Sequence, residues 1–207
     1  MSRTLYYVHD PMCSWCWAFR PVWEEVVQGL PDDVEVKRLL GGLAPDSDRP
    51  MLPEMRNKLQ GIWRVIQRRV PGTRFNFDFW ERCEPRRSTY PACRAVIAAR
   101  LQGPQYEEPM ILAIQQAYYL EARNPSDSET QIELAGGLGM DGVRFARALA
   151  SVDVQQALLD EIALARALGV SSFPSLVLGA DDRYTVLQHD YLDAELMLAQ
   201  IPGWSEA

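Results

Sequence analysis

The stretch Asp10-Pro11-Met12-Cys13-Ser14-Trp15-Cys16-Trp17 places two cysteines three positions apart, directly after a short β-prone run at 5–8. Apolar residues then recur at helical spacing up to position 30, so we expect the cysteines to open a helix. A second β-prone run follows at 34–40. The sequence therefore predicts a strand–CxxC–helix–strand unit. Because Pro21 lacks an amide hydrogen, we also expect a kink or break near Arg20.

The two cysteines differ in the environment that this arrangement predicts for them. A thiol at the start of a helix meets unpaired backbone N–H groups and the positive end of the helix dipole, which favour the thiolate. We therefore expect Cys13 to be the nucleophile. Cys16 lies one turn deeper on the same face and can resolve a mixed disulfide formed on Cys13. This pattern predicts a thiol–disulfide oxidoreductase with a redox-active disulfide.

The remaining metal-binding residue types are few. A zinc site would need two ligands beyond the CxxC, and the chain offers His9, His189, Cys83 and Cys93 with no second CxxC. We therefore expect no metal. Free cysteines are often simply buried, so we expect Cys83 and Cys93 to be core residues rather than a second redox pair. His9 is expected to be a surface residue at a strand end or, with water or Asp10, to assist proton transfer.

The rest of the chain divides into a helical block and a return to strands. Helical patterns cover 53–70, 88–102, 104–123, 127–138, 141–151 and 152–168. Strand patterns reappear at 175–178 and 184–187 around a turn at 180–182, and a helix at 191–201 follows. The sequence thus predicts an α/β fold, βαβ…ββα, with an all-helical insertion. We expect the sheet domain at 1–45 and 165–207 and the insertion domain at 46–164.

Composition excludes several classes of partner. The 207 residues include 21 Lys and Arg against 28 Asp and Glu, a net charge of −7. A chain with this balance and no long basic run is not built to bind nucleic acid or an anionic membrane surface. No apolar run is long enough to span a membrane, and the first residues carry no apolar stretch typical of a secretion signal. We therefore expect a cytoplasmic protein.

A downstream motif completes the pattern. Phe173-Pro174 stands directly before the predicted strand at 175, where a proline is tolerated. With Gly169-Val170 and the stretch at 10–17, it resembles the DsbA-like branch of the thioredoxin superfamily, and more closely the FrnE-like cytoplasmic members. The resemblance covers the whole chain. It implies a thioredoxin fold, a cis Pro174 packed beside the cysteines, and a Phe173 backbone that hydrogen-bonds an extended substrate.

The dipeptide between the cysteines departs from the family pattern. Strongly oxidising members place a histidine there, whereas this chain has Ser14-Trp15. We expect both residues to contribute to substrate binding. Trp15 is expected to be exposed and to form an apolar docking surface with Phe173 and Met12. The buried carboxylate that many thioredoxins carry on the first strand is absent from 5–8.

Two other function classes stay open. Kappa-class glutathione transferases and 2-hydroxychromene-2-carboxylate isomerases share the architecture, but they typically have a serine where Cys13 stands and lack the second cysteine. A chaperone-like binding protein would use the helical block and need neither cysteine. For the oxidoreductase we expect protein or small-molecule thiols and disulfides as partners, glutathione as a candidate co-substrate, and no bound cofactor.

Overall fold

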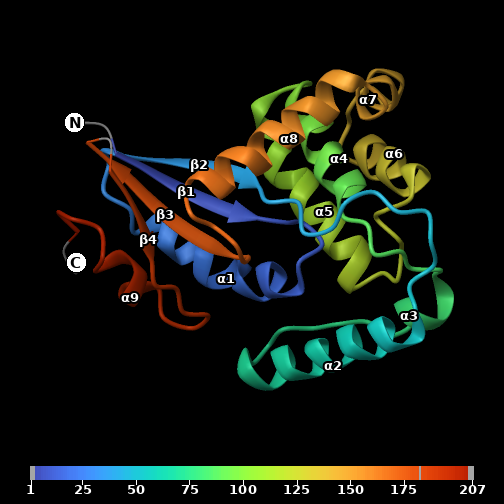
Figure 1. Ribbon diagram of the computed structural model, residues 1–207, viewed down its shortest axis with the longest axis horizontal. Coiled ribbons are helices and arrows are strands. Elements are labelled where there is room, and N and C mark those ends of the chain that lie inside the picture. The colour runs from blue at the N-terminus through green and yellow to red at the C-terminus, as the bar shows by residue number, and fades with distance from the viewer. Residues whose placement is uncertain (1–2, 182, 205–207) are drawn as a thin grey trace.

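The structure is a computed structural model that describes residues 3–181 and 183–204 (Figure 1). Asp182 of the predicted turn lies outside these ranges, as do residues 1–2 and 205–207 of the predicted sheet domain. In chain order the elements are β1 (Arg3–His9), α1 (Ser14–Gln28), β2 (Val34–Leu40), α2 (Pro53–Arg69), α3 (Phe79–Arg82), α4 (Tyr90–Arg100), the 3-10 turn η1 (Pro104–Tyr106), α5 (Glu107–Tyr119), α6 (Ser128–Gly137), α7 (Gly142–Leu149), α8 (Val152–Ala167), β3 (Ser175–Ala180), β4 (Arg183–Leu187) and α9 (Ala194–Leu198).

A mixed four-stranded sheet in the order β2-β1-β3-β4 unites the two ends of the chain. β1 runs parallel to β2, with Leu5 opposite Val36, and antiparallel to β3, with Leu5 opposite Leu178. β3 and β4 form an antiparallel hairpin. The predicted βαβ…ββα fold with a helical insertion is therefore confirmed.

Different helices cover the two faces of the sheet. Because side chains alternate along β1, its residues pack against the helices on both faces. Leu5 and Tyr7 point into a core shared with α1 and α9, whereas Val8 packs with Ala165 and Leu168 on the α8 side. Figure 1 shows α1 and α9 on one side of the sheet and α8 on the other.

The helices between β2 and β3 build a second core around α4, whose side chains at 95–99 are all buried. Trp63 of α2 packs against Phe79 and Trp80 in this core. Met12 belongs to this helical core rather than to the core of the sheet. The segment that carries Cys13 therefore lies where the two cores meet. No helix in the described ranges is long and apolar enough to cross a membrane.

The first helix has no break at the place where the sequence predicts a kink or a break. α1 continues through Pro21 without a break. Phe19, Val22 and Trp23 are buried against the sheet on either side of the proline. This packing holds the helix together although one backbone donor is missing.

Other boundaries are also corrected. The helix predicted over 104–123 is η1 followed by α5, which ends at Tyr119 shortly before Ala122 adopts a positive φ of 53°. The final helix covers Ala194–Leu198 only and is capped by Asp193, whose side chain accepts the Leu196 N–H. The four-residue α3 had no sequence prediction, because a single turn is too short to show a period.

Candidate active site

Cys13 stands at the N-terminal end of α1. It is the N-cap residue, with an extended backbone, and its carbonyl accepts the Trp17 N–H at 3.0 Å. Its side chain is nearly buried, at 7% exposure, and Cys16 on the first turn is more deeply buried, at 1%. Both thiols are free. The sequence therefore placed the two cysteines correctly: one lies at the helix terminus and one directly behind it.

The two thiols have opposite electrostatic environments. A hydrogen bond from the Cys16 side chain, helped by backbone N–H groups of Cys16 and Trp15, lowers the pKa of Cys13 below its ordinary value. Burial, together with the hydrogen bond to Cys13, raises the pKa of Cys16 well above its ordinary value. The pair can thus hold one thiolate and one thiol, the arrangement that nucleophilic attack followed by resolution requires.

The backbone before β3 forms one wall beside Cys13. The Phe173–Pro174 peptide bond is cis, and the Cys13 Sγ atom donates to the Phe173 carbonyl at 3.6 Å. The Phe173 ring lies over Gly41, where an added Cβ would come within 2.0 Å of the ring. Gly41 also donates its N–H to the His9 carbonyl at 2.7 Å. A glycine is needed at this position because the aromatic ring approaches the backbone so closely.

Asp10 is a fully buried carboxylate three residues before Cys13. It accepts the Met12 N–H at 2.8 Å and the Leu43 N–H at 2.7 Å. The Thr89 hydroxyl donates to it at 2.6 Å and the Cys93 thiol at 3.5 Å. Burial raises the pKa of Asp10, and these hydrogen bonds oppose the rise. Asp10 thereby fixes the turn that leads into Cys13 and ties it to the helical core.

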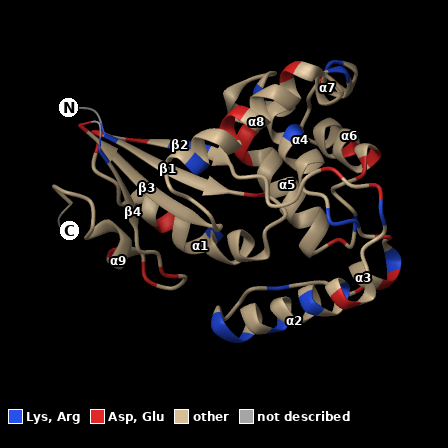
Figure 2. Cartoon of the chain, in the orientation of Figure 1, with Lys and Arg blue, Asp and Glu red and all other residues tan. Residues whose placement is uncertain are grey.

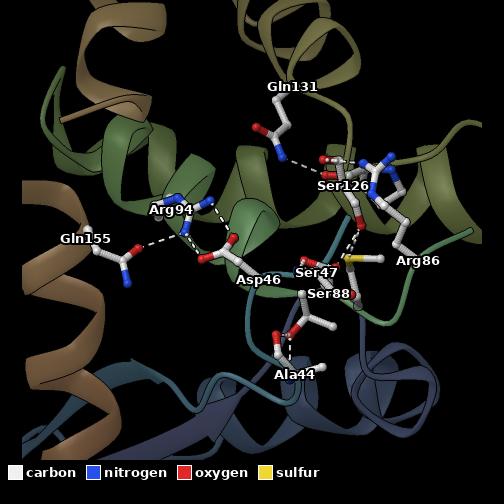
Figure 3. A network of polar contacts seen from close by, with 12 residues as sticks. Ala44, Asp46, Ser47, Arg86, Ser88, Arg94, Ser126, Gln131 and Gln155 are labelled. Atoms are coloured by element: carbon white, nitrogen blue, oxygen red, sulfur yellow. Dashed lines mark hydrogen bonds and ion pairs between the residues drawn. The ribbon is translucent and has the colours of Figure 1, made fainter. Parts of the chain in front are cut away.

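A polar network braces Met12 from the helical side (Figure 3). The Ser126 hydroxyl donates to the Ser88 carbonyl at 2.7 Å and lies 3.6 Å from the Met12 sulfur. Arg94 binds Asp46 at 2.8 Å, which anchors the loop after β2 to α4. Each of these contacts joins segments far apart in sequence, so the sequence alone carried no signal for them.

His9 is buried, so its interpretation as a surface residue is wrong. It is 1% exposed and stacks on Tyr7 at 4.9 Å between ring centroids. With Cys16 it lines a small cavity closed by Arg20, Arg38 and Glu108, among others. Burial, with these arginines, lowers the pKa of His9 to about 3. The imidazole is therefore neutral in the folded protein.

A groove of about 370 Å³ opens beside the cysteines. It is lined by Trp15, Arg69, Ser172, Phe173, Pro174, His189, Asp190, Tyr191 and Leu192. Three of the four residues expected to bind substrate therefore come together, and Ser14 does not line the groove. Sequence reasoning missed Arg69, whose guanidinium carbon lies 5.8 Å from the centroid of the Trp15 ring.

The expected docking surface is only partly formed. Trp15 is half-buried rather than exposed, since it packs on Tyr191 at 5.0 Å between ring centroids. Phe173 lies in the same groove, whereas Met12 is buried in the helical core. The groove is therefore built from the first turn of α1, the end of α2, the segment before β3 and the segment between β4 and α9.

The other two cysteines make different contacts and are not bonded to each other. Cys93 is fully buried beside Asp10, and burial raises its pKa well above the ordinary value. Cys83 is half-buried and donates to the Ala122 carbonyl at 3.1 Å. Within the described ranges no three His, Cys, Asp or Glu side chains are grouped closely enough to hold a metal ion.

The family model described as thioredoxin matches residues 6–187. The match spans both parts of the sheet and the helices between them. The chain belongs to the thioredoxin family. Its fold, like the resemblance in its sequence, is of the DsbA-like type with a helical insertion.

Solved structures resemble this thioredoxin-family chain over most of its length. A proposed protein disulfide isomerase from Nitrosomonas europaea is 30% identical, with a TM-score of 0.83 over 96% of this chain and 95% of its own. The cytosolic disulfide reductase DsbM from Pseudomonas aeruginosa is 26% identical, with a TM-score of 0.74 over 89% of each chain. DsbM has also been solved with GSH, in a structure that is 25% identical with a TM-score of 0.70.

Curated relatives carry a different name. The ClpXP adapter protein SpxH from Halalkalibacterium halodurans is 24% identical over 86% of this chain. SpxH from Bacillus subtilis is 26% identical over 83% of this chain. The chain spans less than three fifths of the length of these two relatives, 59% and 56% respectively.

Proposed function

We propose that this protein is a thiol–disulfide oxidoreductase of the FrnE-like branch, acting in the cytoplasm. The observation that carries the proposal is the Cys13 sulfur at the N-terminus of α1, with a lowered pKa, next to a buried Cys16 and the Phe173 carbonyl. The similarity to a cytosolic disulfide reductase supports both the activity and the location. We further propose 46–164 as the bounds of the insertion domain.

In the proposed reaction, the Cys13 thiolate attacks one sulfur of a substrate disulfide. A bond forms between the Cys13 sulfur and that substrate sulfur, and the other substrate sulfur leaves as a thiolate and takes up a proton. Cys16 then loses its proton and attacks the Cys13 sulfur, which releases the second substrate thiol. The protein is left with a Cys13–Cys16 disulfide, and two electrons have passed to the substrate. In the opposite direction a substrate thiolate attacks the oxidised pair.

The decisive test is disulfide reduction by single-cysteine variants. Cys13→Ser is expected to lose all turnover in an insulin-reduction assay, and Cys16→Ser is expected to stop at the mixed disulfide. Cys83→Ser is the matched control, since Cys83 does not line the groove and its thiol donates to the Ala122 carbonyl. Full activity of Cys13→Ser in that assay would disprove the assignment.

Glutathione is the small-molecule substrate that we propose for the same groove. The solved DsbM structure with GSH supports this choice. In this chain Arg69 places a cation at the groove, where it can pair with a carboxylate of the tripeptide. Glutathione conjugation by a Cys13→Ser/Cys16→Ser double variant would instead favour the transferase or isomerase class.

An adapter function is the second candidate, because the curated relatives are named as ClpXP adapters. An adapter that binds its partner without redox chemistry would keep its affinity after both cysteines are replaced. Partner binding by the same double variant therefore separates an adapter from an oxidoreductase.

A further inference from the structure

The cations on and beside α2 form a distinct feature of the surface. Lys58, Arg64, Arg68, Arg69 and Arg74 are all exposed. No ion pair found within residues 3–181 and 183–204 involves any of the five, although most other arginines with partly buried side chains are paired. We call these five residues the basic track.

The basic track contrasts in charge with the rest of the chain. α2 carries four residues of the track and also Arg56, five cations against the single carboxylate of Glu54, a net charge of +4. The whole chain has a net charge of −7, so the residues outside α2 carry −11. Figure 2 shows basic positions, in blue, distributed along α2, which lies along one side of the molecule. The charge is therefore separated across the molecule, and such separation orients an approaching charged partner.

One end of the basic track reaches the candidate active site. The Arg69 guanidinium lies over the Trp15 ring, between the two cysteines in sequence. The Arg74 carbonyl accepts the Trp17 indole N–H at 3.1 Å, directly after Cys16. Ile66 of α2 packs with Ala18 of α1, which fixes the two helices against each other. A ligand that follows the track is thus led to the reactive sulfur.

The length of the basic track determines the size of the ligand that can use it. Lys58 and Arg69 are 11 positions apart, which corresponds to about 16 Å along a helix at a rise of 1.5 Å per residue. An extended peptide covers about 3.3 Å per residue, so about five residues are needed to span this distance. Glutathione, a tripeptide, can reach Arg69 from the groove but cannot extend to Lys58.

We propose that the basic track is a docking surface for an acidic segment of a protein substrate whose disulfide or thiol reacts at Cys13. The proposal rests on the proposed oxidoreductase function and names its substrate class. An acidic protein segment supplies carboxylates at the spacing of the track, whereas a nucleic acid, with its dense charge, is repelled by the acidic remainder of the chain. Asp190 lines the same groove as Arg69, and its carboxylate accepts the Leu192 N–H in its own turn at 2.8 Å.

The test compares two disulfide-containing peptides that differ only in a tail of about six residues, which are glutamates in one peptide and glutamines in the other. A tail of this length can span the basic track. At low ionic strength the acidic peptide is expected to react about tenfold faster than the neutral one, because unlike charges steer the encounter. The ratio should fall towards one in about 0.5 M salt, which shortens the Debye length to a few ångströms.

Charge-reversal variants locate the effect. Lys58→Glu/Arg64→Glu/Arg68→Glu is expected to abolish the preference for the acidic peptide while its rate with the neutral peptide stays that of the wild type. The matched control reverses three exposed cations elsewhere, Arg147, Arg166 and Arg183, and is expected to keep the preference although its net charge changes equally. Circular dichroism and thermal unfolding establish that both variants fold.

Each remaining outcome has a defined meaning. Equal rates for the two peptides, or a preference that survives in the α2 variant, overturn the proposal. The proposal is also overturned if a short single-stranded DNA binds as tightly as the acidic peptide and the triple α2 variant abolishes that binding, which would assign the surface to nucleic acid. Self-association that the same variant abolishes would assign the surface to a second copy of the chain. If the wild type turns over neither peptide, the oxidoreductase proposal fails. Fluorescence anisotropy with cysteine-free versions of the two peptides then still decides the docking proposal by itself.

Discussion

The Cys13 sulfur lies 3.6 Å from the carbonyl oxygen of Phe173, although 160 residues separate them in the chain. This contact joins the start of α1, before the helical insertion, to the segment that leads into β3, after it. The backbone at 173 therefore contributes both to the surroundings of the Cys13 thiol and to one wall of the groove. Small changes under Phe173 should affect Cys13 without touching either cysteine.

The first prediction concerns the hydrogen bond between the two thiols. Replacing Cys16 by alanine removes the donor that most lowers the pKa of Cys13, so this pKa should rise. Titration of the thiolate absorbance measures the shift, and the alkylation rate of Cys13 at neutral pH should fall with the thiolate fraction, by at most about tenfold for each unit of rise. Cys83→Ser is the control and should leave the titration unchanged. An unaltered pKa in Cys16→Ala would mean that the helix terminus alone activates Cys13.

The second prediction tests the wall at Phe173. Gly41→Ala places a methyl group 2.0 Å from the aromatic ring, so the ring and its backbone must move. We expect a loss of about 1–3 kcal/mol in the free energy of unfolding, typical of an overpacked core, and a slower reaction of Cys13 with peptide disulfides. Gly61→Ala is the matched control, because an added Cβ there meets no atom within 4 Å. Equal stability of the two variants in urea would contradict the contact.

The third prediction concerns buried, neutral His9. Its pKa is about 3 in the folded protein and about 6.5 in the unfolded chain. As the pH falls below 6.5, the unfolded chain gains a proton at His9 that the folded protein does not bind. The free energy of unfolding should therefore fall by up to about 1.4 kcal/mol per pH unit from this residue alone, until the pH approaches 3.

Replacing His9 isolates this contribution. His9→Phe and His9→Gln both lack the titrating group, so their urea-unfolding free energies should change less between about pH 6.5 and pH 4.5 than that of the wild type. The use of two variants separates the charge effect from any packing effect of a larger side chain. Parallel pH profiles for all three proteins would rule out a neutral, buried His9.

The fourth prediction concerns the hydrogen bonds of Asp10. Thr89→Val keeps the shape of the side chain but removes its donor to Asp10 and its acceptor for the Ala44 N–H. Each buried group left without a partner costs about 1–3 kcal/mol, so the midpoint of urea unfolding should fall clearly. Thr185→Val on the exposed face of β4 is the control, with little expected change. A stable Thr89→Val protein would show that Asp10 is held by its other donors.

The sequence was sufficient to predict the elements that rest on local patterns. The strand at 5–8, the CxxC at a helix start and the two strands after Phe173-Pro174 all follow from residue types and spacing, so the fold and the positions of the two cysteines could be predicted. The short α3 and the end of α5 could not, because neither carries a clear periodic signal. Pro21 does not break α1, because the tertiary packing of this helix outweighs the local penalty of the proline.

Contacts over long sequence distances explain what was missed at the site. Asp10 contacts Thr89, 79 residues away, and Arg69 reaches Trp15 from a different helix. A single sequence has no pattern that pairs such residues. The position of His9 at a strand end predicts a surface residue. In the fold His9 lines a small closed cavity together with Arg38 and with Glu108 of the helical insertion.

The pairing of β1 with both β2 and β3 determines when the site can form during synthesis. As the chain leaves the ribosome, Cys13 and Cys16 emerge before the helical insertion, whereas β3 and the Phe173 backbone follow only after it. Until then β1 lacks one neighbour and the thiols lack their covering wall. The two thiols of the nascent chain therefore stay uncovered while the helical insertion is synthesised, and the site is completed only when β3 and β4 join the sheet.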